Sequence, residues 1–119
     1  LEDNIIFDSG DDSKLFSYYK NAKAFIFPSS FEGFGLPLIE AMYSGCPVIC
    51  NNIEVFKEIG SDSVEFFDYN NSDSLINSIE KVVYDSTYSS DLIKKGLNRA
   101  KNFTWRYCSQ LTENVYKHI

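Results

Sequence analysis

The stretch "PSSFEGFGLPLIEAMYSGCPVI", residues 28–49, carries the strongest pattern in this chain. An apolar segment over 24–28 predicts a strand that ends at a proline, and a second apolar segment over 47–50 predicts another buried strand. Between them, residues 36–45 have a proline in the first turn and a glycine at the end, which is typical of a helix. The stretch therefore predicts a strand, a glycine-rich loop, a helix and a strand, in that order.

The rest of the chain continues this alternation of strands and helices. The predicted strands are 4–7, 24–28, 47–50 and 63–69, and the predicted helices are 14–22, 36–45, 54–60, 72–85, 89–103 and 104–119. Ser72 or Ser74 would cap the fourth helix, Thr104 would cap the last, and Gly96 would weaken the one between them. The alternation predicts an α/β fold with a mainly parallel sheet and helices on both faces. Four strands are few for an open sheet of this class, so we expect one part of a larger domain.

The composition narrows the possible classes of function. With 119 residues, 44% of them hydrophobic, the chain can form one compact domain with an apolar core. Its net charge of -6 argues against a general nucleic-acid binder, which needs a basic surface. No nearby histidine completes a zinc site with the three cysteines, so each is expected to pack as a small apolar residue in a reducing compartment. No apolar run approaches the length of a membrane span, and the acidic N-terminal residues do not resemble a signal peptide.

The loop before the helix over 36–45 has the features of an anion-binding site. In sheets of this kind, ligands bind where the carboxyl ends of strands meet the amino ends of helices. Gly33 and Gly35 allow the backbone to turn sharply and to approach a ligand closely. The first N–H groups of a helix lack partners within it, and they favour a negatively charged group such as phosphate. The loop can therefore bind a phosphate without a lysine or an arginine.

Two glutamates, Glu32 and Glu40, need a different explanation. A carboxylate repels a bound phosphate, but it accepts hydrogen bonds from hydroxyl groups. Glu32 precedes the helix, whereas Glu40 lies about one turn inside it and should point away from Leu38, Ala41 and Met42. The ligand that this arrangement suggests has hydroxyl-bearing groups on both sides of its phosphates, which is the layout of a nucleotide sugar. An ordinary loop and a solvated helix residue also account for the same letters, and the spacing alone does not decide between the two interpretations.

The segment "FPSSFEGFGLPLIEAMYSGCPVI", residues 27–49, resembles the signature of the retaining, nucleotide-sugar-dependent glycosyltransferases of group 1 (family 4). The pattern of that family runs from Pro-Ser through Glu-Gly-Phe-Gly-Leu and Glu-Ala-Met to a glycine and Pro-Val-Ile, and all parts are present in order. "AKNFTWRYCSQLTENVYKHI", residues 100–119, is similar to the closing helix of the family. The resemblance implies part of the C-terminal, Rossmann-like domain of a two-domain enzyme of the GT-B fold.

The resemblance also implies how this domain contacts a nucleotide sugar. Glu32, the candidate catalytic residue, would face the donor sugar and bind its hydroxyls. Glu40 would bind the ribose hydroxyls of the nucleotide. Backbone amides of four consecutive residues would contact the donor sugar and the diphosphate: Gly33, Phe34, Gly35 and Leu36.

Some parts of the family pattern are not found in these residues. The donor-binding domain of the family begins with a strand, a glycine-rich loop and a helix, and an arginine and a lysine that contact the diphosphate lie there. The acceptor-binding N-terminal domain is also missing. We therefore expect residues 1–119 to be a single, truncated donor-binding domain that is inactive alone. The only histidine, His118, is expected on the surface, and Lys57 stands where the family often has proline.

The function that the resemblance implies is the transfer of a hexose from a UDP- or GDP-sugar, with retention of configuration. The acceptor would be a saccharide or a lipid-linked molecule held by the missing domain, in the synthesis of a cell-surface polysaccharide or glycoconjugate. No metal, other cofactor or nucleic acid is expected, since backbone dipoles and the basic pair would neutralise the phosphates. The protein is expected in the cytoplasm, where peripheral contact with the inner face of the membrane is one option. Two alternatives stay open, namely a non-catalytic nucleotide-sugar-binding module and a purely structural α/β domain.

Overall fold

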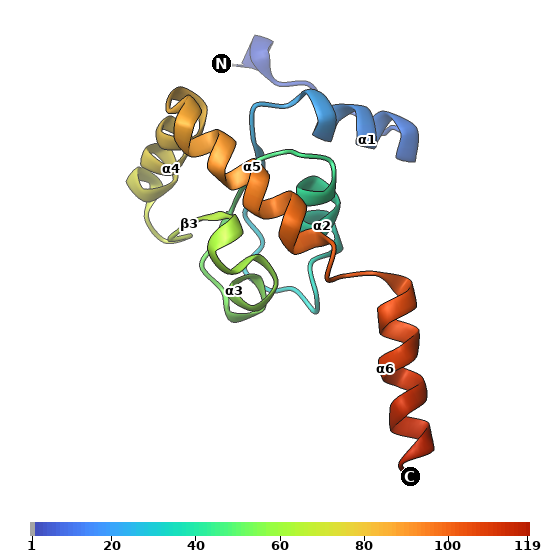
Figure 1. Ribbon diagram of the computed structural model, residues 1–119. Coiled ribbons are helices and arrows are strands. Elements are labelled where there is room, and N and C mark those ends of the chain that lie inside the picture. Colours follow the sequence, from blue (N-terminus) through green and yellow to red (C-terminus); the bar gives the residue numbers. More distant parts are fainter. Residues whose placement is uncertain (1) are drawn as a thin grey trace.

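The structure is a computed structural model, and it describes residues 2–119 of the chain. Within these residues, three short strands alternate with helices (Figure 1). The strands are β1 (Phe25–Phe27), β2 (Val48–Asn51) and β3 (Glu65–Phe67). The helices are α1 (Asp12–Asn21), α2 (Leu36–Tyr43), α3 (Glu54–Gly60), α4 (Ser72–Tyr84), α5 (Ser86–Ala100) and α6 (Trp105–Lys117), with short 3-10 turns at η1 (Glu2–Asn4) and η2 (Ser61–Ser63). Each helix predicted from the sequence is present, and its boundaries move by at most three residues.

The three strands form one parallel sheet in the order β1-β2-β3. In its register, Phe25 pairs with Val48, and Ile49 pairs with Glu65. The central strand β2 is buried along its whole length, because it has a strand on each side and helices above and below. The predicted α/β fold with a parallel sheet is confirmed.

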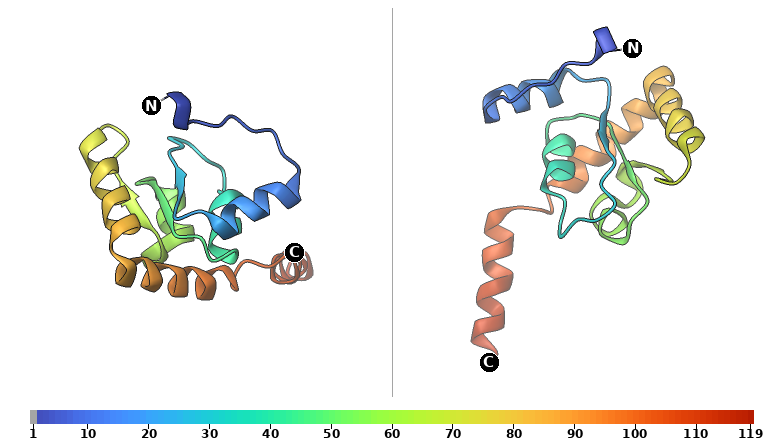
Figure 2. Two further views of the ribbon diagram at one scale, coloured as in Figure 1. Left: turned by 90° about the horizontal axis from the view of Figure 1, so that it is seen from above. Right: turned by 180° about the vertical axis from the view of Figure 1, so that it is seen from behind.

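Helices cover both faces of the sheet, as the alternation predicts. Val48 and Cys50 of β2 belong to the larger apolar cluster, which α2 closes with residues such as Leu38. Ile49 points to the opposite face, where it packs in a second cluster with Val82 of α4. Figure 2 shows α2 and α4 on opposite sides of the strands. Successive side chains of β2 point to opposite faces of the sheet, and each face is therefore covered by its own layer of helices.

The strand predicted over 4–7 is wrong. Asn4 is the last residue of η1, residues 5–7 continue as an irregular segment, and the side chains of Ile6 and Phe7 are 86% and 96% exposed. A strand exists only when a neighbouring strand takes up its backbone N–H and C=O groups. Within residues 2–119, the only strand neighbour of β1 is β2, and no strand pairs with residues 4–7. The apolar letters "NIIF" therefore describe a segment without a strand partner in this part of the chain.

The N-terminal caps of the helices are partly as predicted. Asp11 caps α1 by accepting a hydrogen bond from the amide of Lys14 at 2.9 Å, and Thr104 caps α6 as expected. The cap of α4 is Asn71, whose side chain accepts from the amides of the second and third helical residues, so neither Ser72 nor Ser74 is the cap. Several cap-forming residues stand in a row here, and the sequence alone does not rank them.

Two glycines shape the packing of α2. Gly45 ends the helix in the left-handed region, with φ +74, and the amide of Cys46 reaches back to the carbonyl of Ala41 at 2.9 Å. Gly96 of α5 is buried against α2, where an added Cβ would lie 3.3 Å from Cγ of Met42. Gly96 was expected to weaken its helix, and the structure shows that it also permits the close contact between α2 and α5.

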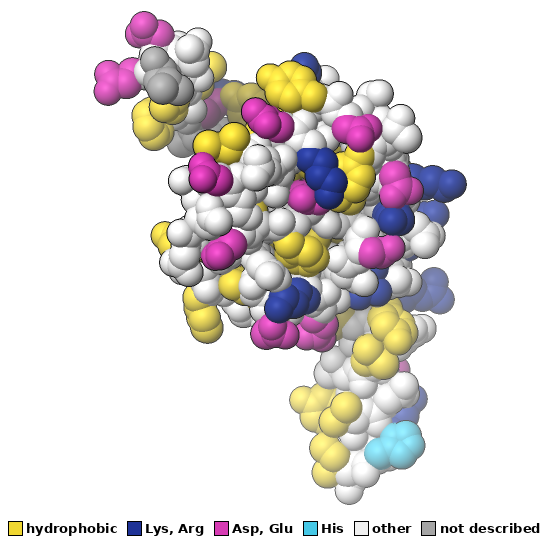
Figure 3. Space-filling model, turned by 90° about the vertical axis from the view of Figure 1, so that its left-hand side faces the viewer, with side chains coloured by type: hydrophobic (Ala, Val, Ile, Leu, Met, Phe, Trp, Pro, Cys, Tyr) yellow, Lys and Arg dark blue, Asp and Glu magenta, His cyan; other side chains and the backbone are white. Residues whose placement is uncertain are grey.

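The last helix, α6, extends away from the rest of the molecule (Figure 1). None of its residues is buried, and the molecule measures 55 × 30 × 28 Å along its principal axes. Figure 3 shows hydrophobic side chains along this exposed helix, with His118 near its end. The large exposed hydrophobic residues of α6 are Trp105, Tyr107, Leu111, Val115 and Tyr116, and the exposed Ile119 follows the helix. No helix within residues 2–119 has the length and apolar character needed to cross a membrane.

Candidate functional site

The loop between β1 and α2 presents a row of free backbone amides. Gly35 precedes α2 with φ +94 and ψ +48, in the left-handed region that glycine favours. No side chain caps α2, and the amide of Leu38 donates to the carbonyl of Gly35 at 3.0 Å. Within the described chain, the amides of residues 33–36 have no hydrogen-bond acceptor. Four consecutive N–H groups before and at a helix start are a suitable arrangement for an anion.

Gly35 is also part of the packing around the core. A Cβ at this position would lie 2.9 Å from Cε1 of Phe56, a ring of α3 that is fully buried. By contrast, an added Cβ at Gly33 meets no atom within 4 Å. The sequence predicts one role for both glycines, which is to let the backbone approach a ligand closely. The structure assigns a second role to Gly35, because the sharp turn brings its backbone against an aromatic ring of the core.

Glu32, the predicted sugar-facing carboxylate, is half-buried and has a hydrogen-bond donor within the loop. The hydroxyl of Ser29 donates to Oε1 of Glu32 at 2.8 Å. Ser29 is itself held by Asn51, whose Nδ2 donates to the Ser29 carbonyl at 3.2 Å. Asn51 is buried at the end of β2, and its Oδ1 accepts from the amides of Asn52 at 2.9 Å and Tyr69 at 3.2 Å. The orientation of Glu32 is therefore linked to the carboxyl end of the central strand.

Sequence reasoning missed this connection between Glu32 and Asn51. The signal in the sequence is a polar residue at the end of the otherwise apolar strand "VICN". A buried amide side chain needs partners for its oxygen and its nitrogen. Its position beside Ser29 depends on the pairing of β1 with β2, which the sequence does not specify.

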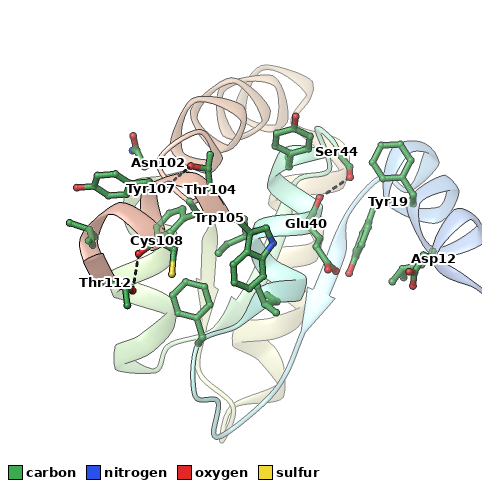
Figure 4. Close-up of a pocket in the computed structure, with 18 residues that line it drawn as sticks. Asp12, Tyr19, Glu40, Ser44, Asn102, Thr104, Trp105, Tyr107, Cys108 and Thr112 are labelled. Atoms are coloured by element: carbon green, nitrogen blue, oxygen red, sulfur yellow. Dashed lines mark hydrogen bonds between the residues drawn. The ribbon is translucent and has the colours of Figure 1, made fainter. Parts of the chain in front are cut away.

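Glu40 lies on the solvent-facing side of α2, as predicted. Leu38, Ala41 and Met42 are buried on the other side of the same helix. The backbone carbonyl of Glu40 accepts a hydrogen bond from the hydroxyl of Ser44 at 2.7 Å, and its carboxylate is directed toward α1 (Figure 4). The carboxylate of Glu40 therefore stands at the surface of α2, on the side where α1 lies.

A cavity of about 900 Å³ lies between α1, α2 and the segment that leads into α6. Figure 4 shows Tyr19 of α1 and Glu40 of α2 at one side of this cavity, with Trp105 and Cys108 of α6 at the other. Of the predicted site residues, the cavity is lined by Phe34, Leu36 and Glu40. Its lining does not include Glu32, Gly33 or Gly35. The structure thus brings the two glutamates to different sides of the loop, one inside the cavity and one outside it.

Phe34 anchors the glycine loop to the segment before α6. Its ring meets that of Phe103 edge-on, with centroids 6.1 Å apart. The Phe103 ring also contacts Arg99, whose guanidinium lies 5.3 Å from the ring centroid. The same guanidinium donates hydrogen bonds to the carbonyls of Glu58 and Ile59 at the end of α3. These contacts fix the side chain of Phe34 and leave its backbone amide free.

Two of the three cysteines and the histidine lie away from the cavity, whereas Cys108 lines it. Burial raises the pKa of Cys46 to about 11 and that of Cys50 to about 12, so both stay neutral thiols and pack as predicted. Cys108 is exposed on α6, where apolar packing was expected. His118 is exposed near the C-terminus, in agreement with the prediction. Residues 2–119 contain no group of three histidine, cysteine or acidic side chains arranged to hold a metal ion.

Comparisons with known proteins give the same family as the motif. The sequence model described as "Glycosyl transferases group 1" matches residues 1–99. The chain is 37% identical over 106 residues to O-antigen chain mannosyltransferase B of Escherichia coli, covering 89% of this chain and 28% of that protein. It is 32% identical over 110 residues to the serotype-specific mannosyltransferase WbdA of Escherichia coli, covering 91% of this chain and 12% of that protein.

A solved structure supports the assignment of the fold. Sucrose-phosphate synthase from Thermosynechococcus elongatus matches 98% of this chain and 30% of its own, with a TM-score of 0.85 and 27% sequence identity. The chain thus spans less than a third of the length of each of these three proteins. The family match and the shared fold agree with the motif over 27–49. This chain belongs to the group 1 glycosyltransferases, and its fold is that of a domain of a GT-B glycosyltransferase.

Proposed function

We propose that the full-length protein transfers a hexose from a UDP- or GDP-sugar to a saccharide or lipid-linked acceptor, with retention of configuration. Residues 1–119 supply part of the donor-binding domain, and a separate N-terminal domain binds the acceptor. The observation that carries the proposal is the row of four free amides over 33–36, with Glu32 on one side and Glu40 on the other. Family membership supports the same assignment.

The diphosphate of the donor binds to the free amides at the start of α2. The chain has a net charge of -6, so backbone dipoles are the favourable partner for an anion in this part of the protein. Negative charge builds up on the diphosphate as the bond to the sugar breaks. Amides that are already fixed by the left-handed Gly35 stabilise this charge without reorganising.

Glu32 binds the hydroxyls of the donor sugar and acts on the reacting ring. Its hydrogen bond from Ser29 occupies one carboxylate oxygen, and the other oxygen is free to accept from a sugar hydroxyl. A carboxylate in this place also stabilises the positive charge that develops on the ring. Attack by the carboxylate itself is chemically possible, but we rank it below this supporting role.

Glu40 binds the two ribose hydroxyls of the nucleotide. It belongs to α2, so it lies at a fixed place relative to the amides that hold the phosphates. Its carboxylate points into the cavity beside α2, which has room for a nucleoside. The loss of hydrogen bonds to a charged group costs about 1.5–3 kcal/mol, which is roughly a ten- to a hundredfold change in affinity.

The names of the relatives suggest which sugar to test first. Two relatives from Escherichia coli are named mannosyltransferases, one of them for the O-antigen chain, so we propose mannose as the first donor sugar and a cell-surface polysaccharide as the product. Divalent metal ions are not needed, because amides and the basic pair of the remaining part of the donor domain neutralise the phosphates. We place the reaction in the cytoplasm, with peripheral contact at the inner face of the membrane.

The full-length protein tests this proposal directly. It is incubated with UDP- or GDP-hexoses, including GDP-mannose, and a panel of saccharide and lipid-linked acceptors, and release of the nucleoside diphosphate is measured. NMR of the product gives the anomeric configuration. We expect turnover with one nucleotide, retention at the anomeric carbon, and no loss of rate with a chelator present.

Three other outcomes contradict the proposal in different ways. Tight binding of a nucleotide sugar without turnover on any acceptor identifies the non-catalytic binding module. Absence of binding to both UDP and GDP identifies a structural domain. An inverted anomeric configuration rejects the retaining mechanism but keeps the transferase.

A further inference from the structure

We propose that Tyr19 is a positioning residue for Glu40, because its buried hydroxyl holds one side of the carboxylate while the other side is left for the ribose hydroxyls. This inference rests on the proposed function, since it assigns a partner to the ribose-binding residue. It concerns α1, which the motif over 27–49 does not include.

The ring of Tyr19 has little freedom to move. The residue is only 6% exposed, although the neighbouring α1 residues Leu15 and Phe16 are about half exposed. The ring meets Phe25 of β1 edge-on, with centroids 5.1 Å apart and an interplanar angle of 87°. Phe25 is fixed in turn by its amide, which donates to the carbonyl of Pro47 at 2.8 Å. The hydroxyl of Tyr19 therefore has a position that is set by the sheet.

The hydroxyl of this fixed ring is directed at the carboxylate of Glu40 (Figure 4). Burial, and after it the negative charge of Glu40 and hydrogen bonding to its carboxylate, together raise the pKa of Tyr19 to about 12. The phenol therefore stays protonated near neutral pH, and its O–H is available to donate to the carboxylate that it faces.

A donor of this kind solves a problem of the exposed glutamate. Glu40 lies on the solvent-facing side of α2, and a free glutamate side chain there would populate several rotamers. A carboxylate has about four acceptor sites, so it can accept from Tyr19 and from two vicinal hydroxyls at once, provided that it keeps one orientation. A hydrogen bond from a buried phenol selects that orientation before the nucleotide arrives, and lowers the entropy lost on binding.

Tyr18, the preceding residue, provides a matched control. It lies on the same helix, is about half exposed, and its hydroxyl binds Asp8 on the outer side of α1. Tyr18→Phe removes the same atom as Tyr19→Phe, but from a contact that does not face the cavity. The aromatic ring remains in both variants, so the packing of α1 is retained.

The test is calorimetric titration of the full-length protein with UDP, GDP and their 2′,3′-dideoxy analogues. We expect Tyr19→Phe to weaken binding of the preferred ribonucleotide about three- to tenfold, since the carboxylate must then be ordered on binding while its hydrogen bonds to the ribose remain. Binding of the dideoxy analogue, which lacks the hydroxyls, should be unchanged, as should both affinities in Tyr18→Phe. In a background of Glu40→Ala, Tyr19→Phe should have no further effect.

Three results would overturn the inference while the proposed function stands. They are unchanged ribonucleotide affinity in Tyr19→Phe, equal losses for the ribonucleotide and its dideoxy analogue, and additive losses with Glu40→Ala. Wild-type protein that binds neither UDP nor GDP refutes the proposed function itself, and the inference with it.

A second measurement needs no ligand and no change at Tyr19. NMR titration of tyrosine ring carbons in the full-length protein reports the pKa of the Tyr19 phenol, with its signal assigned from the Tyr19→Phe spectrum. Glu40→Gln removes the negative charge and should lower this pKa, whereas it should leave that of Tyr18 unchanged. An unchanged Tyr19 pKa in Glu40→Gln shows that the two side chains do not interact, and overturns the inference.

Discussion

Replacing Gly35 by alanine should destabilise the fold as well as weaken ligand binding. An added Cβ lies 2.9 Å from Cε1 of Phe56 and 3.4 Å from Cδ1. Phe56 is 0% exposed, so its ring cannot move aside into solvent. In addition, the backbone at Gly35 has φ +94, which residues with a side chain rarely adopt. Two independent costs therefore fall on one methyl group.

The size of the effect follows from these two costs. A left-handed backbone costs a residue with a Cβ about 1–2 kcal/mol. Overpacking of a close-packed core costs about 1–3 kcal/mol. The free energy of unfolding of this domain should fall by about 2–5 kcal/mol, and the melting temperature of the full-length protein should fall with it.

The assay is thermal unfolding of the full-length protein, followed by circular dichroism and calorimetry. Gly33→Ala is the control in the same loop, because an added Cβ there meets no atom within 4 Å. Its stability should change by less than about 0.5 kcal/mol. Phe56→Leu removes Cε1, so the double variant with Gly35→Ala should be less destabilised than the sum of the two single variants.

Equal melting temperatures for Gly35→Ala and Gly33→Ala would refute this reasoning. Such a result means that the loop relaxes away from Phe56 and that the left-handed backbone is not required. Strict additivity of Gly35→Ala and Phe56→Leu would refute the steric part alone, and the remaining loss would then come from the backbone conformation.

Three further predictions concern side chains of the site and of the core. Glu40→Ala should weaken binding of the nucleoside diphosphate about ten- to a hundredfold, whereas Glu32→Ala should mainly lower turnover; equal losses of nucleotide affinity contradict these roles. Ser29→Ala should lower turnover severalfold without changing nucleotide affinity, since it frees the Glu32 carboxylate, and substitution of the next serine serves as control. With a pKa of about 12, Cys50 has a thiolate fraction of about one in ten thousand at pH 8, so iodoacetamide should label Cys108 and leave Cys50 unmodified, as mass spectrometry of the peptides will show.

The features that the sequence predicts well are those encoded by neighbouring residues. The helix over 36–45 has its proline near the start and its glycine at the end, and the structure begins and ends α2 within two residues of that prediction. The inward and outward faces of α2 follow from a period of 3.6 residues, which places Glu40 opposite Met42 and Leu38 correctly.

The features that the sequence does not predict depend on contacts between distant residues. Gly35 meets Phe56 only because α2 and α3 pack on the same face of the sheet. Asn51 reaches the carbonyl of Ser29 because β1 and β2 are neighbours. The apolar segment over 4–7 reads as a strand, but whether it forms one depends on a partner strand and not on its own letters.

The two glutamates have one physical problem in common, which their partners solve in different ways. Each is a negative charge near four amides that, on the proposed function, must hold a diphosphate, and a mobile carboxylate would compete for those amides or repel the ligand. Ser29 ties Glu32 to the end of β2, through Asn51, and the buried Tyr19 stands between Glu40 and β1. The position of each carboxylate is thereby linked, through these neighbours, to a strand of the sheet. On the proposed function, a site for a diphosphate flanked by hydroxyls can in this way be built in a chain of net charge -6, because each carboxylate has a neighbour that limits its movement.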